Sequence, residues 1–425
     1  MNAIYLLKNE IKHYDWGSTA WIPELLDQSN EKGEPYAELW MGVHPSGMSL
    51  ADGRDSTIAL KTLIESNKQF FLGRQVKNKF NGLPYLFKLL AAEKPLSIQA
   101  HPNLEQAKRG FERENERAMT LDNPSRNYKD ANHKPEIICA LSPFRAMCGF
   151  RTIPDIISLL KKFNCPVVLP LIKIFDTDKN TNAQSESSAG RSIGDSENLY
   201  KRFLTKLFSL SLDDRNKISD YIKNHSIALK EQAPEFNREW DMLVLFNRYY
   251  DSDPAVLSPL YLNVLDLKPG ESVFLPAGVL HAYISGFGVE LMANSDNVLR
   301  GGLTHKYIDS TELLSILNLE PFLPRIFKPN NDSYFEYPTE ASEFSLVCMK
   351  SDERSIEKKC DIAGPTIIIV VEGELVIRFK NGEDPLKVKK GRSIFIAAEL
   401  NRDDFSLTGS YTFYAAHCVC PQNEG

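Results

Sequence analysis

The sequence predicts a mainly β protein, with two β-sandwich or barrel units and an all-helical domain inserted into the first of them. Short apolar runs between Gly and Pro turns fill residues 1–149 and 254–325 and return in residues 326–425, which is typical of antiparallel sandwiches and barrels. Residues 150–253 instead carry apolar side chains at helical spacing. At 425 residues, the chain is long enough for two or three domains.

The elements of the first unit follow from local patterns. "YAELWMGVHPSG" (36–47) indicates a strand that runs into a loop, and "LPYLFKLLAAEKPLSIQAHP" (83–102) carries two more apolar segments. "NLEQAKRGFERENERAM" (103–119) predicts a surface helix behind an Asn cap, because its few apolar residues recur at helical spacing among charges. Strands return in residues 260–292, and "STELLSILN" (310–318) predicts a short helix.

The inserted domain and the last unit have equally distinct patterns. "IPDIISLLKKF" (153–163), residues 198–232 and "EWDMLVLFNRYY" (239–250) predict helices. Residues 176–198 form a Ser/Asn/Gly-rich polar run, which we expect to be a mobile loop. In the last hundred residues, "TIIIVVEGELVIRFKNG" (366–382) reads as strands separated by turns.

Composition excludes several classes of partner. The formal net charge is −6, so no global basic field favours nucleic acid or an anionic membrane surface. No apolar stretch approaches the roughly 20 residues that cross a bilayer, and the N-terminus lacks the long apolar core of a signal peptide. The seven cysteines are an odd number without a C-x-x-C pair, which indicates buried thiols in a reducing compartment. We therefore expect a cytoplasmic protein, and nothing in the sequence demands an oligomer, so we expect a monomer.

Gln99 and His101 raise the question of chemistry. They lie two residues apart in the apolar stretch "LSIQAHP", so on a strand they face the same side. Two polar side chains on an inward face need partners, because burying them unpaired is costly. A metal would supply such a partner. A solvated strand face is the alternative, and these two residues alone favour it.

Glu136 and His281 favour the metal. Glu136 ends "NYKDANHKPE" just before an apolar run, and His281 ends a G-x5-P-x-G-x2-H pattern. In this pattern a turn at Pro276 and Gly278 presents the histidine at the start of the next strand. This pattern resembles the second metal motif of cupins, the small jelly-roll barrels, although the asparagine often found four residues after the histidine is Ser285 here.

The four side chains offer a mixed nitrogen and oxygen ligand set. Two imidazoles, one carboxylate and one amide oxygen suit zinc acting as a Lewis acid with an open coordination position. The absence of nearby thiolates argues against a closed structural zinc. Two histidines and a carboxylate can also hold iron, so ligand type leaves an oxygenase open.

The densest polar stretch runs from His281 to Lys306. Residues 294–297 ("NSDN") form a polar cluster within strand-forming sequence, followed by Arg300 and two glycines. The glycines would let the backbone approach a ligand closely. Arg300 could clamp an anion or stabilise developing negative charge, and a surface salt bridge is the alternative.

These motifs resemble the type I mannose-6-phosphate isomerase family. "YKDANHKPE" (128–136) resembles the family signature Y-x-D-x-N-H-K-P-E without a mismatch. Residues 281–306 resemble its second signature, with His305 in place of a proline. "YDWGS" (14–18) and "AELWMGVHPSG" (37–47) look like the family's N-terminal landmarks. The resemblance covers the whole chain in order, weakest in the helical insertion and the last hundred residues.

The resemblance implies a zinc enzyme that interconverts mannose 6-phosphate and fructose 6-phosphate, with one zinc ion per chain. The family's metal ligands fall on Gln99, His101, Glu136 and His281. Its essential arginine falls on Arg300, and lysines of its active site fall on Lys134 and Lys94. The implied architecture is a catalytic cupin domain, a helical domain and a second cupin domain without metal, in agreement with residues 1–149 with 254–325, residues 150–253 and residues 326–425.

The implied reaction moves a proton from C2 of an aldose to C1 through an enediol(ate), with zinc polarising the substrate oxygens. Lys134 is one acid/base candidate. Glu290, Asp296, Tyr283 and a metal-bound water are others, and we also expect Tyr283 and Asp296 at substrate-binding positions. Arg300 would stabilise the enediolate. The phosphate would supply binding energy through local cations such as Lys94.

Two other functions fit parts of the pattern. A cupin dioxygenase would use iron in the same site, and a sugar-phosphate-binding cupin would keep the ligands without turnover. The two signatures speak against the first, and the joint presence of Arg300 and Lys134 speaks against the second. Structural roles are the prediction for several polar residues close to these motifs: Lys88, Lys306, His133, His13 and His44.

Overall fold

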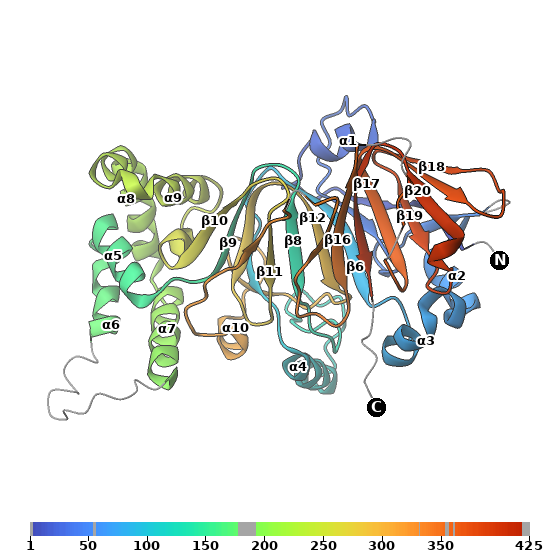
Figure 1. The fold of residues 1–425 in the computed structure, drawn as a ribbon. Helices are drawn as coiled ribbons and strands as arrows, with labels where there is room; N and C mark the ends of the chain where they lie inside the picture. The colour runs from blue at the N-terminus through green and yellow to red at the C-terminus, as the bar shows by residue number, and fades with distance from the viewer. Residues whose placement is uncertain are drawn as a thin grey trace, which may run out of the picture.

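Two antiparallel sheets dominate the computed structural model, which describes residues 3–53, 57–176, 193–330, 332–352, 357–359 and 362–418. The helical domain lies at one end of an elongated molecule and the C-terminal strands at the other, with the first sandwich between them (Figure 1). In the described residues neither sheet's strand path closes on itself, so the units are sandwiches rather than closed barrels. The predicted mainly β class with a helical insertion is confirmed.

The first sheet forms both layers of the first sandwich. One layer has the order β14 (Ile326–Phe327), β11 (Ser272–Leu275), β8 (Glu136–Ala140), β12 (His281–Ala293), β6 (Tyr85–Ala92), β3 (Glu38–Met41) and β2 (Glu10–Lys12). The other layer contains β13 (Leu299–Gly302), β7 (Ile98–Ala100), β9 (Phe144–Phe150) and β10 (Leu262–Leu267), joined to the first through β12.

Strand β12 belongs to both layers because it changes partners at Gly286. Its first residues pair with β7 and β9, and its residues from Gly286 onward pair with β6 and β8. Gly286 has φ +125°, and a Cβ there would lie 2.7 Å from Phe144 Cα. Only glycine accepts this combination of backbone angle and close approach. One strand therefore supplies His281 to one layer and Glu290 to the other.

The second sheet packs against the outer face of the first sandwich. Its order is β15 (Tyr334–Tyr337), β16 (Ser345–Ser351), β21 (Tyr411–His417), β17 (Thr366–Phe379), β19 (Ser393–Ile396), β1 (Ile4–Lys8), β4 (Leu50–Asp52) and β5 (Thr57–Ala59), with β18 (Leu386–Lys389) and β20 (Phe405–Thr408) paired to β17. Phe87 and Leu291 of the first sheet share one buried cluster with Ile369 and Phe395 of the second. Strand β6 is therefore buried on both faces, which explains why it is apolar except at Lys88.

The start of the chain lies in the second sheet. Strand β1 pairs with β19, with Ile4 opposite Ile396, and with β4 on its other side. The predicted first unit, residues 1–149 with 254–325, thus contributes strands to both sheets. A pairing across almost 400 residues is invisible to local periodicity.

The inserted helices follow the predicted pattern. They are α5 (Ile153–Phe163), η1 (Leu169–Ile172), α6 (Lys173–Asp176), α7 (Ile193–Phe208), α8 (Leu212–Gln232), η3 (Pro234–Phe236), α9 (Asn237–Tyr249) and η4 (Pro254–Leu260). Phe163 and Trp240 stack in their core, with ring centroids 6.5 Å apart. Most of the predicted loop, residues 176–198, lies outside the described residues, but its last six positions belong to α7. That part of the prediction was wrong.

The remaining helices lie around the sandwiches: α1 (Trp21–Leu26), α2 (Leu60–Ser66), α3 (Lys68–Phe80), α4 (Leu104–Glu116), α10 (Ser310–Ile316) and η5 (Arg402–Asp404). The predicted Asn cap is confirmed, because Asn103 accepts the Gln106 N–H in a reciprocal capping box on α4. The prediction of only short apolar runs over residues 60–80 was wrong. Gly73, at φ +73°, kinks α3 and divides its helical periodicity into two short pieces.

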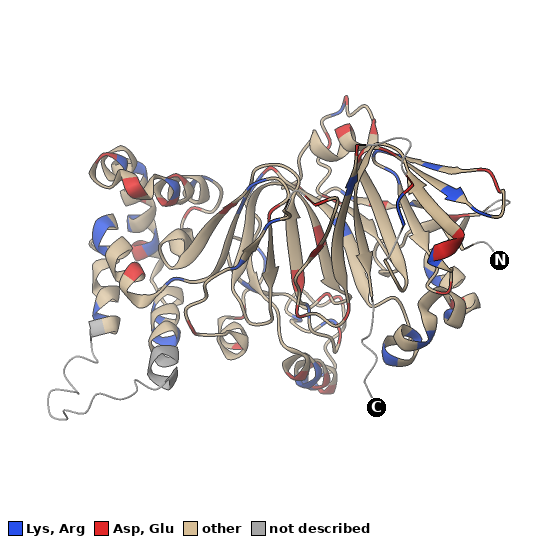
Figure 2. Ribbon diagram, in the orientation of Figure 1, with Lys and Arg blue, Asp and Glu red and all other residues tan. Residues whose placement is uncertain are grey.

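Charge is distributed unevenly over this frame. Lys, Arg, Asp and Glu gather on the helices and strand ends, while the central strands are mostly uncharged (Figure 2). Of the described helices, none is long and apolar enough to cross a membrane. Charged side chains inside the first sandwich are therefore exceptions that need an explanation.

Candidate metal centre

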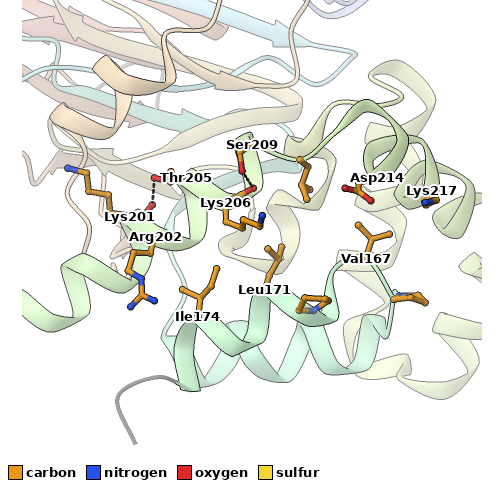
Figure 3. Close-up of a pocket in the computed structure, with 13 residues that line it drawn as sticks. Val167, Leu171, Ile174, Lys201, Arg202, Thr205, Lys206, Ser209, Asp214 and Lys217 are labelled. Carbon is orange, nitrogen blue, oxygen red and sulfur yellow. Dashed lines mark hydrogen bonds between the residues drawn. The ribbon is translucent and has the colours of Figure 1, made fainter. Parts of the chain in front are cut away.

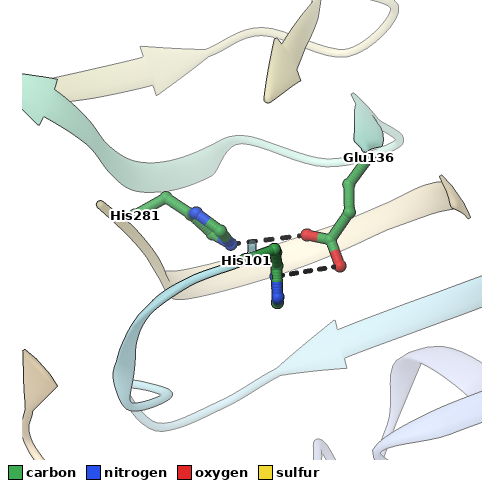
Figure 4. Close-up of side chains that lie close together, drawn as sticks. All are labelled: His101, Glu136 and His281. Atoms are coloured by element: carbon green, nitrogen blue, oxygen red, sulfur yellow. Dashed lines mark ion pairs between the residues drawn. The ribbon is translucent and has the colours of Figure 1, made fainter. Parts of the chain in front are cut away.

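Three of the predicted ligands meet inside the first sandwich. His101 Nε2 lies 3.3 Å from Glu136 Oε1, and His281 Nε2 lies 3.4 Å from Glu136 Oε2 (Figure 4). One ligand atom from each residue falls within 4.8 Å of the others, and the side chains are only 1–2% exposed. No other group of three His, Cys, Asp or Glu side chains in the described residues has this geometry.

Strand ends place the three side chains. Glu136 is the first residue of β8, His281 is the first residue of β12, and His101 directly follows β7. The turn before β12 depends on Gly278, which has φ +77° and donates its N–H to the His101 carbonyl at 2.8 Å. The turn that presents His281 is thus bonded to the segment that carries His101.

Both histidines are oriented by backbone carbonyls. His101 Nδ1 lies 2.7 Å from the Asn297 carbonyl oxygen, and His281 Nδ1 lies 2.9 Å from that of Val279. A carbonyl only accepts, so each Nδ1 carries the proton and each Nε2 presents a lone pair toward Glu136. This is the outer support found for imidazoles that bind a cation.

The electrostatics also suit a cation. Burial, reinforced by the nearby Lys134 charge, lowers the pKa of His101 to about 4, so its ring is neutral at pH 7. Burial opposes ionisation of Glu136, but the charge of Lys134 and the two histidines outweigh it and hold the pKa of this carboxyl well below its usual range. His101 Nε2 and Glu136 Oε2 are buried without a hydrogen-bond partner. A divalent metal would satisfy these atoms, so the residues fit the predicted ion.

Gln99 and Arg300 lie on the two strands that follow the strand of His281 across the sheet. On adjacent strands, His281 of β12 pairs with Gln99 of β7, and Gln99 pairs with Arg300 of β13. Side chains directly opposite each other in antiparallel strands share a face. The Gln99 amide lies 3.4 Å from His281 Nε2, and because amide O and N are assigned rather than observed, its oxygen can occupy that position. Burial lowers the pKa of Arg300.

Lys134 and Asp296 lie in the loops over the cluster. Lys134 Nζ lies 2.8 Å from Glu136 Oε1, and its side chain is 9% exposed. Asp296 is half-exposed and accepts from His44 Nε2 at 3.1 Å, because His44 Nδ1 accepts the Ser46 N–H. Burial alone would raise the pKa of Asp296, but the His44 contact lowers it overall. His44 therefore has a defined partner that the sequence did not reveal.

A second charged group fills the space between the layers. Lys88 Nζ lies 3.0 Å from Glu290 Oε2 and 3.7 Å from Glu38 Oε1, and all three side chains are less than a tenth exposed. Burial raises the pKa of Glu290 despite the Lys88 charge. Tyr283 is also buried, with its hydroxyl unpaired and its pKa raised by burial. In the sequence, this buried group is indicated only by a single lysine, Lys88, or a single glutamate, Glu290, within a mostly apolar strand.

The other predicted residues lie farther from the ligands or bond elsewhere. Lys94 is a partly exposed residue of the turn between β6 and β7, where its N–H donates to the Trp16 carbonyl. His13 Nδ1 lies 2.8 Å from the Pro35 carbonyl oxygen. His133 is bonded to Glu343 at 2.8 Å, and Lys306 is exposed.

A cavity of about 1010 Å³ in the helical domain holds none of the predicted site residues (Figure 3). Residues of η1, α6, α7 and the start of α8 line it, among them the apolar Leu171 and the basic Lys201 and Lys206. The buried cluster of His101, Glu136 and His281 lies in the first sandwich instead.

The fold and the buried site together define an antiparallel β-sandwich protein whose site fits a metal ion. A family model described as the catalytic domain of type I phosphomannose isomerase matches residues 4–153. Mannose-6-phosphate isomerase of Salmonella typhimurium is 38% identical over 409 residues, covering 95% of this chain and 97% of the relative. The Escherichia coli enzyme of the same name is 37% identical over 398 residues, covering 92% of this chain and 94% of that one. The chain belongs to the mannose-6-phosphate isomerase family.

Solved structures agree with this assignment. A zinc-bound mannose 6-phosphate isomerase has a TM-score of 0.84 at 32% identity, covering 98% of this chain and 100% of the other. A lysine-to-alanine variant of the Salmonella typhimurium phosphomannose isomerase has a TM-score of 0.85 with the same identity and coverage. The predicted family is therefore confirmed over nearly the whole chain.

Proposed function

We propose that this protein is a zinc-dependent aldose–ketose isomerase that interconverts D-mannose 6-phosphate and D-fructose 6-phosphate. The observation that carries the proposal is the buried set His101, Glu136 and His281, in which His101 Nε2 and Glu136 Oε2 have no hydrogen-bond partner. Relatives of this chain are named mannose-6-phosphate isomerase. The proposal includes the expected monomer and cytoplasmic location.

The ligands of the proposed ion are His101, Glu136, His281 and the Gln99 amide oxygen. Zinc, when bound, supplies Lewis acidity that polarises the substrate oxygens and makes the C2 proton more acidic. The protein orients the two imidazoles through Nδ1 and keeps Glu136 ionised. Burial of these side chains strengthens every charge interaction at the site.

The proton transfer belongs to groups beside the ligands. Lys134, 2.8 Å from Glu136, and the buried Lys88–Glu290 pair are the acid/base candidates that the geometry favours. Burial raises the pKa of Glu290, and the charges of Lys88, Glu136 and Lys134 also act on it, which supports treating these groups as one electrostatic environment. Tyr283 and Asp296 flank this space as substrate-binding groups of the proposal.

Arg300 stabilises the negative charge of the enediolate in this proposal. The pairing of its backbone with Gln99 on the adjacent strand supports this role, because residues opposite each other share a face of the sheet. Lys94 remains the predicted phosphate contact, where a cation far from the reacting carbons would add binding energy.

A coupled assay of fructose 6-phosphate formation tests the function. Turnover should disappear on chelation and return with zinc. His281→Ala should lose zinc and turnover together, whereas His13→Ala should retain both, since His13 is exposed and bonds only to the Pro35 carbonyl among its described polar contacts. A folded, zinc-loaded wild type without turnover would refute the isomerase and favour the binding module, and iron-dependent oxygen uptake would indicate the dioxygenase.

A further inference from the structure

Asn297 is the most fully bonded side chain near the metal centre. It is 0% exposed and lies just after β12, in the second signature segment. Its Oδ1 accepts the backbone N–H of Lys129 at 2.7 Å and of Asp130 at 3.2 Å. Its Nδ2 donates to the carbonyls of Asp130 and Asn132, both at 2.8 Å. The amide therefore holds the loop of residues 129–132 from both sides.

The orientation of this amide follows from its partners. Backbone N–H groups can meet only the oxygen, and carbonyls can meet only the nitrogen, so the amide cannot be reversed. An aspartate has the same shape, but its second oxygen would face the Asp130 and Asn132 carbonyls and repel them. Among residues of this size, asparagine alone satisfies all four backbone groups.

The backbone of Asn297 supports a predicted ligand. Its carbonyl accepts the His101 Nδ1–H at 2.7 Å, which directs His101 Nε2 toward Glu136. The loop held by the side chain leads, two residues after Asn132, to Lys134 and then to Glu136. One buried residue thus supports His101 through its backbone carbonyl and holds the loop that precedes Lys134 and Glu136 through its side chain.

Neighbouring bonds strengthen the same connection. Ser295 Oγ lies 2.9 Å from Asp130 Oδ1, and the Asp296 N–H donates to Asp130 Oδ2 at 2.8 Å. Asp130 Oδ1 also accepts the Asn132 N–H at 2.9 Å. The segment 295–297 and the loop 129–132 are therefore joined by side-chain and backbone bonds. Asn297 and Ser295 are buried, so bonds lost from these two side chains are costly.

We propose that Asn297 is a positioning residue that sets the distance between His101 and the Lys134–Glu136 segment, and so tunes both metal affinity and proton transfer. The second effect rests on the proposed function, but the first does not. Substitutions in the outer support of a metal site typically weaken affinity by about 10–100-fold. A weakening in this range is the expected consequence of releasing the loop.

The test is the zinc affinity of Asn297→Asp, measured by competition with a chromogenic chelator. Asn247→Asp is the matched control, because Asn247 is also a buried asparagine whose Nδ2 donates to a backbone carbonyl, that of Ser219, but it lies in the helical domain. We expect Asn297→Asp to bind zinc at least about tenfold more weakly than wild type. Asn247→Asp should lose thermal stability and keep wild-type zinc affinity.

Two further readouts keep the proposal falsifiable. Asn297→Ser, which removes the paired donors without adding a charge, decides the question if Asn297→Asp does not fold. At saturating zinc, kcat should fall more than KM rises, because the Lys134 segment is displaced. Wild-type zinc affinity in a folded Asn297 variant overturns the proposal. A wild type without isomerase turnover refutes the proposed function but leaves the affinity comparison valid.

Discussion

Replacing Lys88 with methionine would leave two carboxylates buried without their cation. Lys88 Nζ lies 3.0 Å from Glu290 Oε2 and 3.7 Å from Glu38 Oε1, and the three side chains are 7%, 4% and 9% exposed. Methionine keeps most of the side-chain volume, so the change removes charge rather than packing. Removing one partner of a buried ion pair costs about 3–5 kcal/mol, and we expect the unfolding free energy of the metal-free protein to fall by this amount at pH 8.

The loss should depend on pH. Burial raises the pKa of Glu290, and the Lys88 charge opposes this rise, so Lys88→Met raises the pKa further. A carboxyl whose folded pKa lies above its unfolded value stabilises the folded state when protonated, and this contribution is lost as the pH rises through the folded pKa. The deficit of Lys88→Met relative to wild type should therefore be smaller at pH 5 than at pH 8.

Urea unfolding of the metal-free proteins, followed by circular dichroism at both pH values, measures this effect. Lys88→Met/Glu290→Gln should recover part of the loss, because one unpaired charge is removed and Glu38 keeps the Trp40 Nε1–H at 2.6 Å. Lys61→Met, at an exposed position of α2, should stay within about 0.5 kcal/mol of wild type. A Lys88→Met protein as stable as wild type at pH 8, or a deficit that grows toward pH 5, would refute the reasoning.

Three other predictions concern the turn, the ion and a helix cap. Gly278→Ala should lower stability and weaken zinc binding, because the residue has φ +77° and its new Cβ would lie 2.9 Å from the Ile316 carbonyl oxygen. A titration with zinc measures the affinity, and a wild-type value would contradict this prediction. Free zinc at a hundred times its Kd should stabilise the wild type by about 2.7 kcal/mol against urea and should leave His281→Ala unchanged. Asn103→Ala should cost about 1 kcal/mol through the lost cap of α4, without changing zinc affinity, and an unaltered unfolding midpoint would speak against the cap's contribution.

Much of this protein could be read from local sequence. The helical insertion, the Asn103 cap and the turn before His281 depend on spacings of a few residues, which the chain carries wherever it folds. His101, Glu136 and His281 were predicted as ligands from motif spacing and family resemblance, and the structure brings these three side chains together. Their strand ends supply the positions, so local pattern and site geometry agree.

Only the tertiary structure decided the remaining features. Lys88 interrupts an apolar strand in the sequence, and it acquires a partner because β6 and β12 pair with Lys88 opposite Glu290. Strand β1 pairs with β19, which lies almost 400 residues away, and Asn297 bonds to a loop about 165 residues earlier. Periodicity reports which face of a strand is apolar, but the register between distant strands is set by the packing of whole layers. The partners of the buried charges and the bonds of Asn297 to residues 129–132 are therefore formed only when the first sandwich is assembled.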